Sequence, residues 1–223
     1  GGTSGDSGAA IQIQASSTTM GGRFYMYGGT VIGGKAVNDS KSINGGALSL
    51  RHKDSQAFIY GGTIIGGEAN GCGGNIFVER GKLWLYGGTV TGGKAGGNGG
   101  NLYVNGADAY VYLKGNTIFE AADAGSSGSN IYVANGTVEM ENGTVSGTNA
   151  FDVEDGAKLK ISGGTFTDGL TVDGRAVKDI LAADRILVKA ENNVLVLLAE
   201  GATTSGTESV CVLAQPQVSE DLK

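Results

Sequence analysis

The chain has 223 residues, 40% of them hydrophobic and 17% charged, which is enough apolar material for an ordered interior in one domain or at most two. Its 42 glycines against a single proline follow no Gly-X-Y period, so collagen and proline-rich linkers are excluded. The 16 Lys and Arg residues against 22 Asp and Glu give a net charge of −6 without a basic stripe, which disfavours nucleic acid as a partner.

The sequence lacks the signals of membrane insertion, secretion leaders and cofactor binding. It has no run of about 18 apolar residues and no basic segment followed by an apolar stretch, so we expect no membrane insertion. Cys72 and Cys211 follow no metal-binding spacing and indicate no disulfide framework. Without a phosphate-binding loop or a Cys/His cluster, the sequence implies no cofactor.

Two short patterns recur along the chain. An aromatic residue, two glycines and a threonine appear at 27–30, 60–63 and 86–89, and in decayed form at 114–117, 141–144 and 162–165. Gly-Gly-Asn appears at 73–75 and 99–101, with a Gly-Ser-Asn variant at 128–130. The patterns recur roughly every 26 to 29 residues over most of the chain, a period typical of solenoids.

Each period contains three short segments in which apolar residues alternate, which is the spacing of strands and not of helices. Five residues per period are predicted to point inward. In chain order these are Ile11, Ile13, Phe24, Met26 and Val31; Leu48, Leu50, Ala57, Ile59 and Ile64; Ile76, Val78, Leu83, Leu85 and Val90; Leu102, Val104, Val111, Leu113 and Ile118; Ile131, Val133, Val138, Met140 and Val145; and Phe151, Val153, Leu159, Ile161 and Phe166. With glycines at the corners, they predict an all-β parallel β-helix solenoid of about six three-strand coils over residues 1–173.

Other repeats of this period do not match. A leucine-rich repeat needs an L-x-x-L-x-L consensus, and calcium-binding nonapeptides need a recurring Asp after the glycines. The segment of about residues 8–172 resembles the right-handed parallel β-helix family, the pectate-lyase-like fold, in its three-strand coils and its Gly-Gly-Asn and Tyr-Gly-Gly-Thr patterns. They are also similar to repeat regions of large adhesin-like surface proteins of gut-type bacteria. The resemblance implies an extracellular or cell-surface location.

The pattern changes after the sixth repeat, and residues 174–223 are predicted to form a C-terminal cap. We expect a short helix over 175–184 and strands over 186–188, 194–198 and 210–213, the first two strands joined by 191–193. Such a cap would cover the strand edges that a solenoid end exposes. No comparable cap is recognised before Ile11, so either a preceding coil or domain is missing or residues 1–10 cover this end, and of the two we favour a fragment of a longer protein.

Stacking of successive coils about 4.8 Å apart predicts outward columns of equivalent residues. In two of these columns the first residues are aromatic and the later ones are mostly charged. The first column reads Tyr25, Phe58, Trp84, Tyr112, Glu139 and Lys160, and the second Tyr27, Tyr60, Tyr86, Lys114, Glu141 and Ser162. We call the seven aromatic residues of these columns the aromatic face. Their side chains either stabilise the sheet or form a platform for sugar rings or for a protein partner.

Three further columns are predicted. Phe77, Tyr103 and Tyr132 form a shorter outward aromatic column flanked by Ser49 and Asp152, and Lys35, Glu68 and Lys94 form an exposed charge ladder of little energetic weight. A threonine column raises the question of ice binding, but its companion positions are too irregular for a lattice match. The column is Thr30, Thr63, Thr89, Thr117, Thr144 and Thr165, and the companions are Ile32, Ile65, Thr91, Phe119, Ser146 and Thr167.

The pectate-lyase-like resemblance makes a carbohydrate-active enzyme the natural rival. Glu139 and Glu141 lie about 7 Å apart on one predicted strand, a separation compatible with inverting glycosidases. Two carboxylates on an open strand beside Lys160 are, however, more often a salt ladder than a catalytic pair. Asp152, Glu154 and Asp155 could supply oxygen ligands to calcium, but surface turns of this kind are usually solvated. The single histidine, His52, lacks partners for a catalytic triad.

These observations favour a non-enzymatic binding or adhesion segment of a bacterial surface or secreted protein. The expected ligand-binding residues are those of the aromatic face, and the expected partner is a glycan, or else a host or neighbouring-cell surface protein. Two alternatives stay open. One is a polysaccharide lyase or hydrolase acting near Glu139 and Glu141, and the other is a purely structural stalk.

Overall fold

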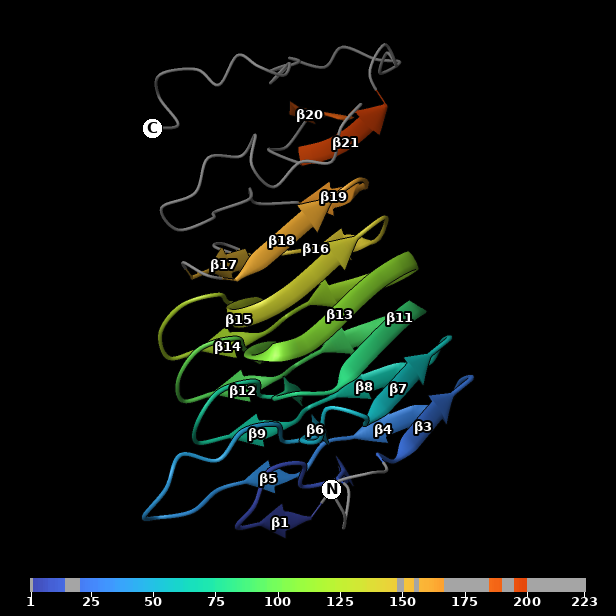
Figure 1. Ribbon diagram of the computed structural model, residues 1–223. Helices are drawn as coiled ribbons and strands as arrows, with labels where there is room; N and C mark the ends of the chain where they lie inside the picture. The colour runs from blue at the N-terminus through green and yellow to red at the C-terminus, as the bar shows by residue number, and fades with distance from the viewer. Residues whose placement is uncertain are drawn as a thin grey trace.

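A computed structural model describes residues 2–14, 21–147, 151–154, 157–166, 185–189 and 195–199. The described residues form an all-β structure of 21 strands, with no helix among them, in one sheet of five strands and one of sixteen. Successive strands stack in layers from β1 to β19 (Figure 1). The helix expected over 175–184 and the strand expected over 210–213 lie outside the described residues.

The large sheet contains three rows of parallel strands, and each strand pairs with its equivalent in the next repeat. The first row consists of β2 (Ile11–Ile13), β6 (Leu48–Leu50), β10 (Ile76–Val78), β13 (Leu102–Glu120), β15 (Ile131–Met140) and β17 (Phe151–Val153). The second row consists of β3 (Arg23–Met26), β7 (Gln56–Ile59), β11 (Lys82–Thr91), then β13 and β15 again, and β18 (Lys158–Ile161).

The third row consists of β4 (Thr30–Ile32), β8 (Thr63–Ile65), the ends of β11 and β13, β16 (Thr144–Val145) and β19 (Gly164–Phe166). The small sheet is also parallel throughout. It consists of β1 (Thr3–Ser4), β5 (Lys35–Ala36), β9 (Glu68–Ala69), β12 (Lys94–Ala95) and β14 (Asp123–Ala124). Every pairing from β1 to β19 is therefore parallel.

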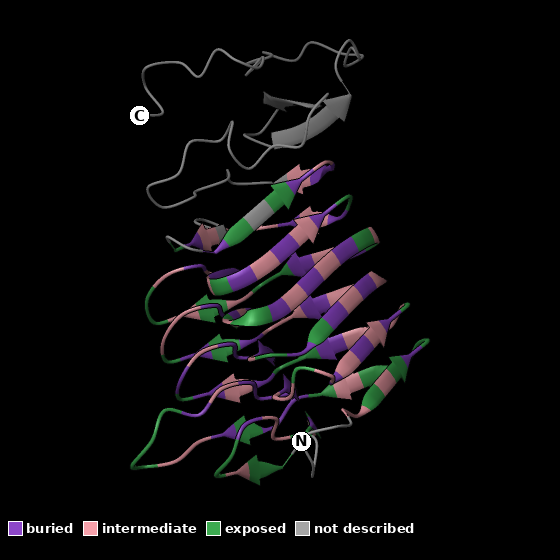
Figure 2. Ribbon diagram, viewed as in Figure 1, coloured by how far each residue is buried: buried purple, intermediate pink, exposed green. Residues whose placement is uncertain are grey.

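The core fills the space enclosed by these rows, with buried and more exposed residues alternating along the strands (Figure 2). All five residues predicted to point inward in the second, third and fifth repeats are buried. In the first repeat Ile11, Phe24 and Val31 are only partly buried but pack against the same cluster. Alternation of side chains along a strand, visible in the sequence, therefore identified nearly the whole core.

The fourth repeat departs from the prediction. Five residues separate Leu113 from Phe119, whereas four separate Leu85 from Val90 in the repeat before. The extra residue shifts the strand register, so that Val90 pairs with Phe119 and Phe119 is fully buried. Ile118, predicted to point inward, instead pairs with Thr89. The assignment of Ile118 to the core and of Phe119 to the outer surface was therefore wrong.

The same shift removes Thr117 from the predicted threonine column. The side chain of Thr117 is buried, and its hydroxyl donates to the carbonyl oxygens of Leu85 and Lys114 at 3.2 Å each. The column in the structure reads Thr30, Thr63, Thr89, Ile118, Thr144 and Thr165. An isoleucine interrupts the array, which weakens the case for ice binding further.

After the sixth repeat the strand direction reverses. Two strands, β20 (Arg185–Lys189) and β21 (Leu195–Ala199), pair antiparallel with each other, and β21 pairs antiparallel with β19. The strands expected over 186–188 and 194–198 are confirmed to within a residue or two. No helix among the described residues is long and apolar enough to cross a membrane.

Candidate binding site on the aromatic face

The aromatic face is built by strand register. The pairing of β3, β7, β11 and β13 places Tyr25 beside Phe58, Phe58 beside Trp84, and Trp84 beside Tyr112. The column continues through Glu139 to Lys160, in the order that the sequence predicted. The second column lies two residues further along the chain, where Tyr27 and Tyr60 directly follow β3 and β7 and Tyr86 lies within β11.

Six of the seven aromatic side chains form two ladders of three stacked rings. In the first ladder the ring centroids of Tyr25, Phe58 and Trp84 lie 4.9 and 4.6 Å apart, with interplanar angles of 8° and 2°. The second ladder joins Tyr27, Tyr60 and Tyr86 at 5.0 Å per step, with angles of 5° and 6°. These spacings match the strand repeat, so the backbone register itself sets the stacking.

The ladder geometry determines which part of each ring a ligand can reach. Both faces of Tyr60 are covered by its neighbours, yet Tyr60 is 43% exposed, so its exposed surface is the ring edge and the hydroxyl. At the N-terminal end of the ladders, Tyr25 is 46% and Tyr27 is 76% exposed. A sugar ring therefore cannot lie flat on the middle of either ladder. It can contact ring edges there, and ring faces only at the ends.

Tyr112 does not extend the first ladder. The nearest ring to Trp84 on that side is Tyr110, at 6.4 Å between centroids and an interplanar angle of 55°. The hydroxyl of Tyr112 donates to a carboxylate oxygen of Glu141, and the Lys114 amine lies 5.8 Å from the centroid of the Tyr112 ring. Tyr112 thus belongs to a charged cluster beside the ladders.

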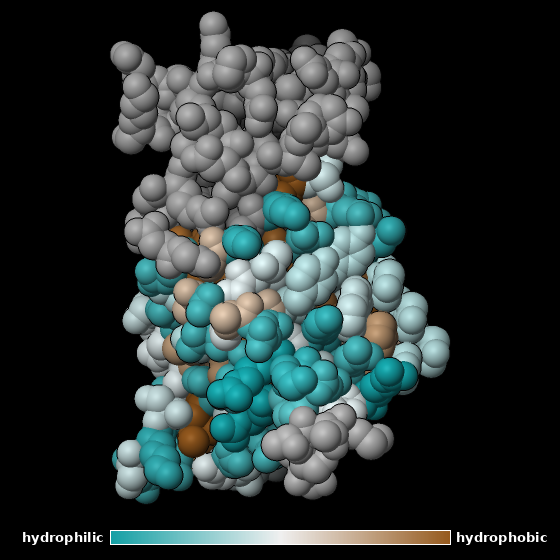
Figure 3. All heavy atoms as spheres, viewed as in Figure 1, coloured by the Kyte–Doolittle hydropathy of each residue, from teal (hydrophilic) through white to brown (hydrophobic). Residues whose placement is uncertain are grey.

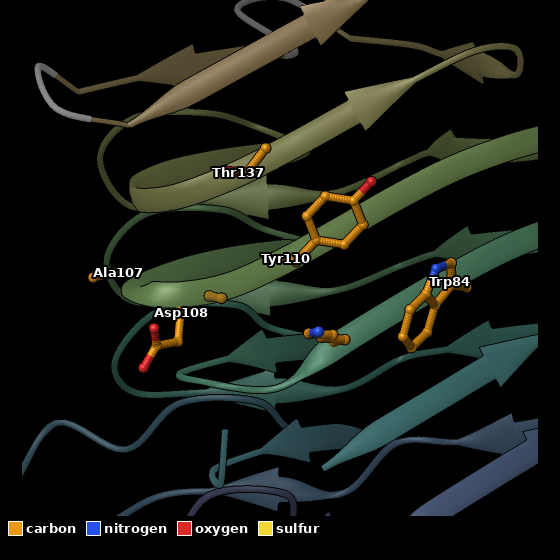
Figure 4. A pocket seen from close by; sticks show the side chains of 7 residues that line it. Trp84, Ala107, Asp108, Tyr110 and Thr137 are labelled. Carbon is orange, nitrogen blue, oxygen red and sulfur yellow. The ribbon is translucent and has the colours of Figure 1, made fainter. Parts of the chain in front are cut away.

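A hollow of about 300 Å³ opens where the first ladder ends. Trp84 and Tyr110 line it with their rings, and Asp108, Lys82 and Thr137 add polar groups (Figure 4). The remaining lining residues are Ala107 and Ala109. Strongly hydrophobic residues are visible only at scattered points on the face of the molecule drawn in Figure 3.

Sequence reasoning missed Tyr110, although a signal for it was present. Tyr110 lies one outward position before Tyr112, in a column that reads Arg23, Gln56, Lys82, Tyr110, Thr137 and Lys158. That column is polar apart from Tyr110, so a search for repeated aromatic residues passes over it. An alignment of every outward position over all six repeats identifies Tyr110.

Each of the two candidate catalytic carboxylates is held by a tyrosine and a lysine. Glu139 accepts from the Tyr110 hydroxyl and from the Lys160 amine, both at 3.0 Å. Glu141 accepts from the Tyr112 hydroxyl and lies 3.3 Å from the Lys114 amine. The hydrogen bond from Tyr112, with help from Lys114, lowers the pKa of the Glu141 carboxyl. A general acid for glycoside cleavage needs the opposite shift.

The same cluster perturbs its tyrosines. Burial, followed by the hydrogen bond to Glu139, raises the pKa of Tyr110 well above its usual value. The hydrogen bond to Glu141 is the main cause of the raised pKa of Tyr112. Both phenols therefore stay protonated as hydrogen-bond donors around neutral pH.

The shorter aromatic column is in register but is not open to solvent. Phe77 stacks on Tyr103 at 5.5 Å, and Tyr103 contacts Tyr132 at 5.9 Å. Phe77 and Tyr132 are each only 5% exposed, because glycine-containing turns cross over them. The three residues keep the outward register that the sequence predicted, but Phe77 and Tyr132 are buried and Tyr103 is half-buried, so the column offers a ligand little surface. The hydroxyl of Tyr132 donates to Glu154, one of the carboxylates considered for calcium.

The other predicted polar positions are occupied by local contacts. Lys35 pairs with Glu68 at 2.9 Å, and the ladder continues in register to Lys94 and Asp123. Nδ1 of His52 accepts from the backbone N–H of Asp54 at 3.2 Å. Within the part of the chain that the structure describes, no three His, Cys, Asp or Glu side chains converge as a metal site. Asp155 lies outside the described residues.

Comparison with known proteins finds no match to this chain among family models, curated proteins or solved structures.

Proposed function

We propose that residues 8–172 wind as a right-handed parallel β-helix, and that this helix is a non-enzymatic binding or adhesion segment of a bacterial surface or secreted protein. The parallel pairing of each strand with its equivalent one repeat later supports the winding. The C-terminal residues from 174 would cap it, in keeping with the antiparallel pairing of β21 with β19. The partner we propose is a glycan, contacted through the aromatic face.

One observation carries this proposal. Two ladders of aromatic rings lie side by side in the outward columns, and three of their tyrosines, Tyr25, Tyr27 and Tyr60, keep more than two fifths of their surface exposed. Stabilising a sheet does not require exposed phenols, whereas a row of hydroxyl-tipped ring edges offers apolar contact and hydrogen bonds together. Sugars present the same mixture of C–H and O–H groups.

The neighbouring charges favour binding over catalysis. Glu141 is held ionised by Tyr112 and Lys114, and Glu139 already accepts two hydrogen bonds. Neither carboxylate is left to protonate a leaving group or to activate a water without first breaking those contacts. These hydrogen bonds and ion pairs favour a structural role for the charged cluster, which lies at one end of the aromatic face.

Retention on immobilised polysaccharides tests the proposal. The variant Tyr27→Ala/Tyr60→Ala removes two exposed phenols of one ladder and should weaken retention about tenfold or more, because two aromatic contacts are lost. The matched control, Ile32→Ala/Ile65→Ala, removes exposed apolar side chains outside the aromatic face and should leave retention unchanged. Equal losses in both variants, or retention unaffected by the tyrosine changes, would reject the aromatic face as the contact surface. Circular dichroism checks that both variants fold.

A further inference from the structure

We propose that the hollow binds one uncharged pyranose unit of the glycan. The hollow is bounded by Trp84, Tyr110, Lys82, Asp108 and Thr137. This inference rests on the proposed function and goes beyond it, because it assigns a subsite, a ligand class and three binding residues outside the aromatic face. These residues are Tyr110, Lys82 and Asp108.

The hollow offers an accessible ring face, which the middle of each ladder lacks. Phe58 covers one face of Trp84 at 4.6 Å and 2°, but on the other side Tyr110 is tilted by 55° and stands 6.4 Å away. The second face of the indole is therefore not closed by a stacked ring. Two aromatic rings at a steep angle form a corner whose walls suit the C–H face of a sugar ring.

The polar groups of the hollow are free to bind. The exposed side chains of Lys82 and Asp108 make no hydrogen bond or ion pair with any residue that the structure describes, whereas Lys35, Lys114 and Lys160 are all engaged in ion pairs. A carboxylate accepts from sugar hydroxyls, and an ammonium donates to hydroxyl and ring oxygens. Because one positive and one negative side chain line the same hollow, its charges cancel, which favours a neutral unit over a uronate.

A local insertion builds the hollow. Six residues separate Val104 from Val111, whereas four separate the equivalent pairs Val78 and Leu83, and Val133 and Val138. The longer corner contains Ala107, Asp108 and Ala109, which all line the hollow, and Figure 4 labels the first two. The second repeat also has six residues at this position, between Leu50 and Ala57, so the fourth repeat is longer here than its two neighbours in the stack. A departure from the repeat that creates a concave site is where repeat proteins place binding loops.

Trp84 is the only tryptophan of the chain, and the ring face that Phe58 does not cover lines the hollow, so its fluorescence reports on this end of the first ladder. The experiment titrates the full chain with neutral hexasaccharides of glucose, mannose and galactose, and with hexagalacturonate. A neutral hexasaccharide should shift the emission of Trp84 saturably and protect it from quenching by acrylamide. The titration should change little with salt, because no net charge is neutralised.

Matched variants separate the hollow from the rest of the surface. Asp108→Ala and Lys82→Ala should each weaken the fluorescence-detected affinity roughly tenfold, because each removes a charged hydrogen-bonding group. The controls Asp123→Ala and Lys94→Ala change residues of the small sheet that are also exposed, and should leave the affinity unchanged. Thermal unfolding verifies that the four variants fold alike.

The outcomes distinguish this inference from the proposed function. Retention on a polysaccharide without any change in Trp84 emission would overturn the hollow as a subsite and leave the aromatic face as the contact surface. Binding of hexagalacturonate in preference to the neutral sugars, weakening steeply with salt, would overturn the uncharged ligand class. The absence of both retention and emission change with every sugar would overturn the two proposals together.

Discussion

The asparagine of the Gly-Gly-Asn pattern stabilises the strand stack from within. Asn75, Asn101 and Asn130 are all buried, and the amide nitrogen of each of the first two reaches the amide oxygen of the next, at 2.7 and 2.5 Å. The amide oxygen of Asn101 also accepts from the backbone N–H of Gly93. The ladder therefore satisfies backbone groups at a corner where strand pairing stops.

Removing one member of this ladder should be costly. The variant Asn101→Ala leaves polar groups of Asn75, Gly93 and Asn130 without their partner in a buried site, which predicts a loss of about 2 to 4 kcal/mol in the free energy of unfolding. Denaturant-induced unfolding measures it. The exposed Asn142→Ala is the control and should change stability by less than about 0.5 kcal/mol. Similar effects of the two variants would contradict a structural role for the ladder.

Tyrosine ionisation provides a pH test at the same scale. The pKa is raised for Tyr60, Tyr103, Tyr110, Tyr112 and Tyr132, five of the eight tyrosines. A group whose pKa is higher in the folded than in the unfolded chain contributes stability below its unfolded value, here about 10, and loses it as the pH rises through the folded value. We therefore predict that at pH 10 a smaller fraction of the tyrosines is ionised in the folded than in the unfolded chain, and that stability falls above this pH.

Glu141→Gln sharpens this prediction. Because the hydrogen bond to Glu141 is the main cause of the raised pKa of Tyr112, one tyrosine should titrate at lower pH in this variant. The ultraviolet absorbance of tyrosinate measures the change. Glu68→Gln, whose carboxylate pairs with Lys35 instead of a tyrosine, should leave the titration curve unaltered. A curve that Glu141→Gln does not move would show that Tyr112 lacks this partner in solution.

At the corners between strands, the two glycines of the Tyr-Gly-Gly-Thr pattern have different roles. The second glycine adopts positive φ in the first three repeats, +81° at Gly29 and +94° at Gly62 and Gly88. A Cβ on Gly62 would also lie 2.5 Å from the carbonyl oxygen of Gly29 in the neighbouring repeat. The corner therefore needs glycine both for its dihedral angles and for the close approach of successive layers.

The variant Gly62→Ala should lower the free energy of unfolding by about 1 to 3 kcal/mol, because it combines positive φ with a backbone clash. Gly28→Ala changes the first glycine of the same pattern, where a Cβ would meet nothing within 4 Å, and should cost less than about 0.5 kcal/mol. Thermal or denaturant unfolding compares the two. An equal loss in both variants would indicate that the corner geometry is not the one described.

At this scale the sequence predicted the strands well and the corners poorly. Strict alternation identified the inward residues of complete repeats, because each side chain on a strand must alternate between core and surface. Alternation carries no information about residues inserted between strands. One extra residue before Phe119 exchanged it with Ile118, and two extra residues before Val111 created the wall that contains Asp108. The unpredicted part of the candidate site therefore lies at an irregular corner.

The whole molecule brings together residues that the sequence separates by 26 to 33 positions. Tyr27, Tyr60 and Tyr86 stack at 5.0 Å per step only because three repeats lie parallel and in register. The columns of the aromatic face could be read from the sequence, since a repeat fixes which residues are equivalent. The pattern of residue types does not show how the rings stack on one another. Side-chain geometry decides that the ring edges point outward and that one face of the Trp84 indole stays free.

Ring-to-ring nuclear Overhauser effects in a chain with labelled tyrosine rings test this arrangement most directly. The account predicts contacts from the Tyr60 ring to both Tyr27 and Tyr86, each assigned by the loss of one signal in Tyr27→Phe and Tyr86→Phe. Tyr60 rings that contact neither residue, in a folded chain, would contradict the parallel register and with it the aromatic face.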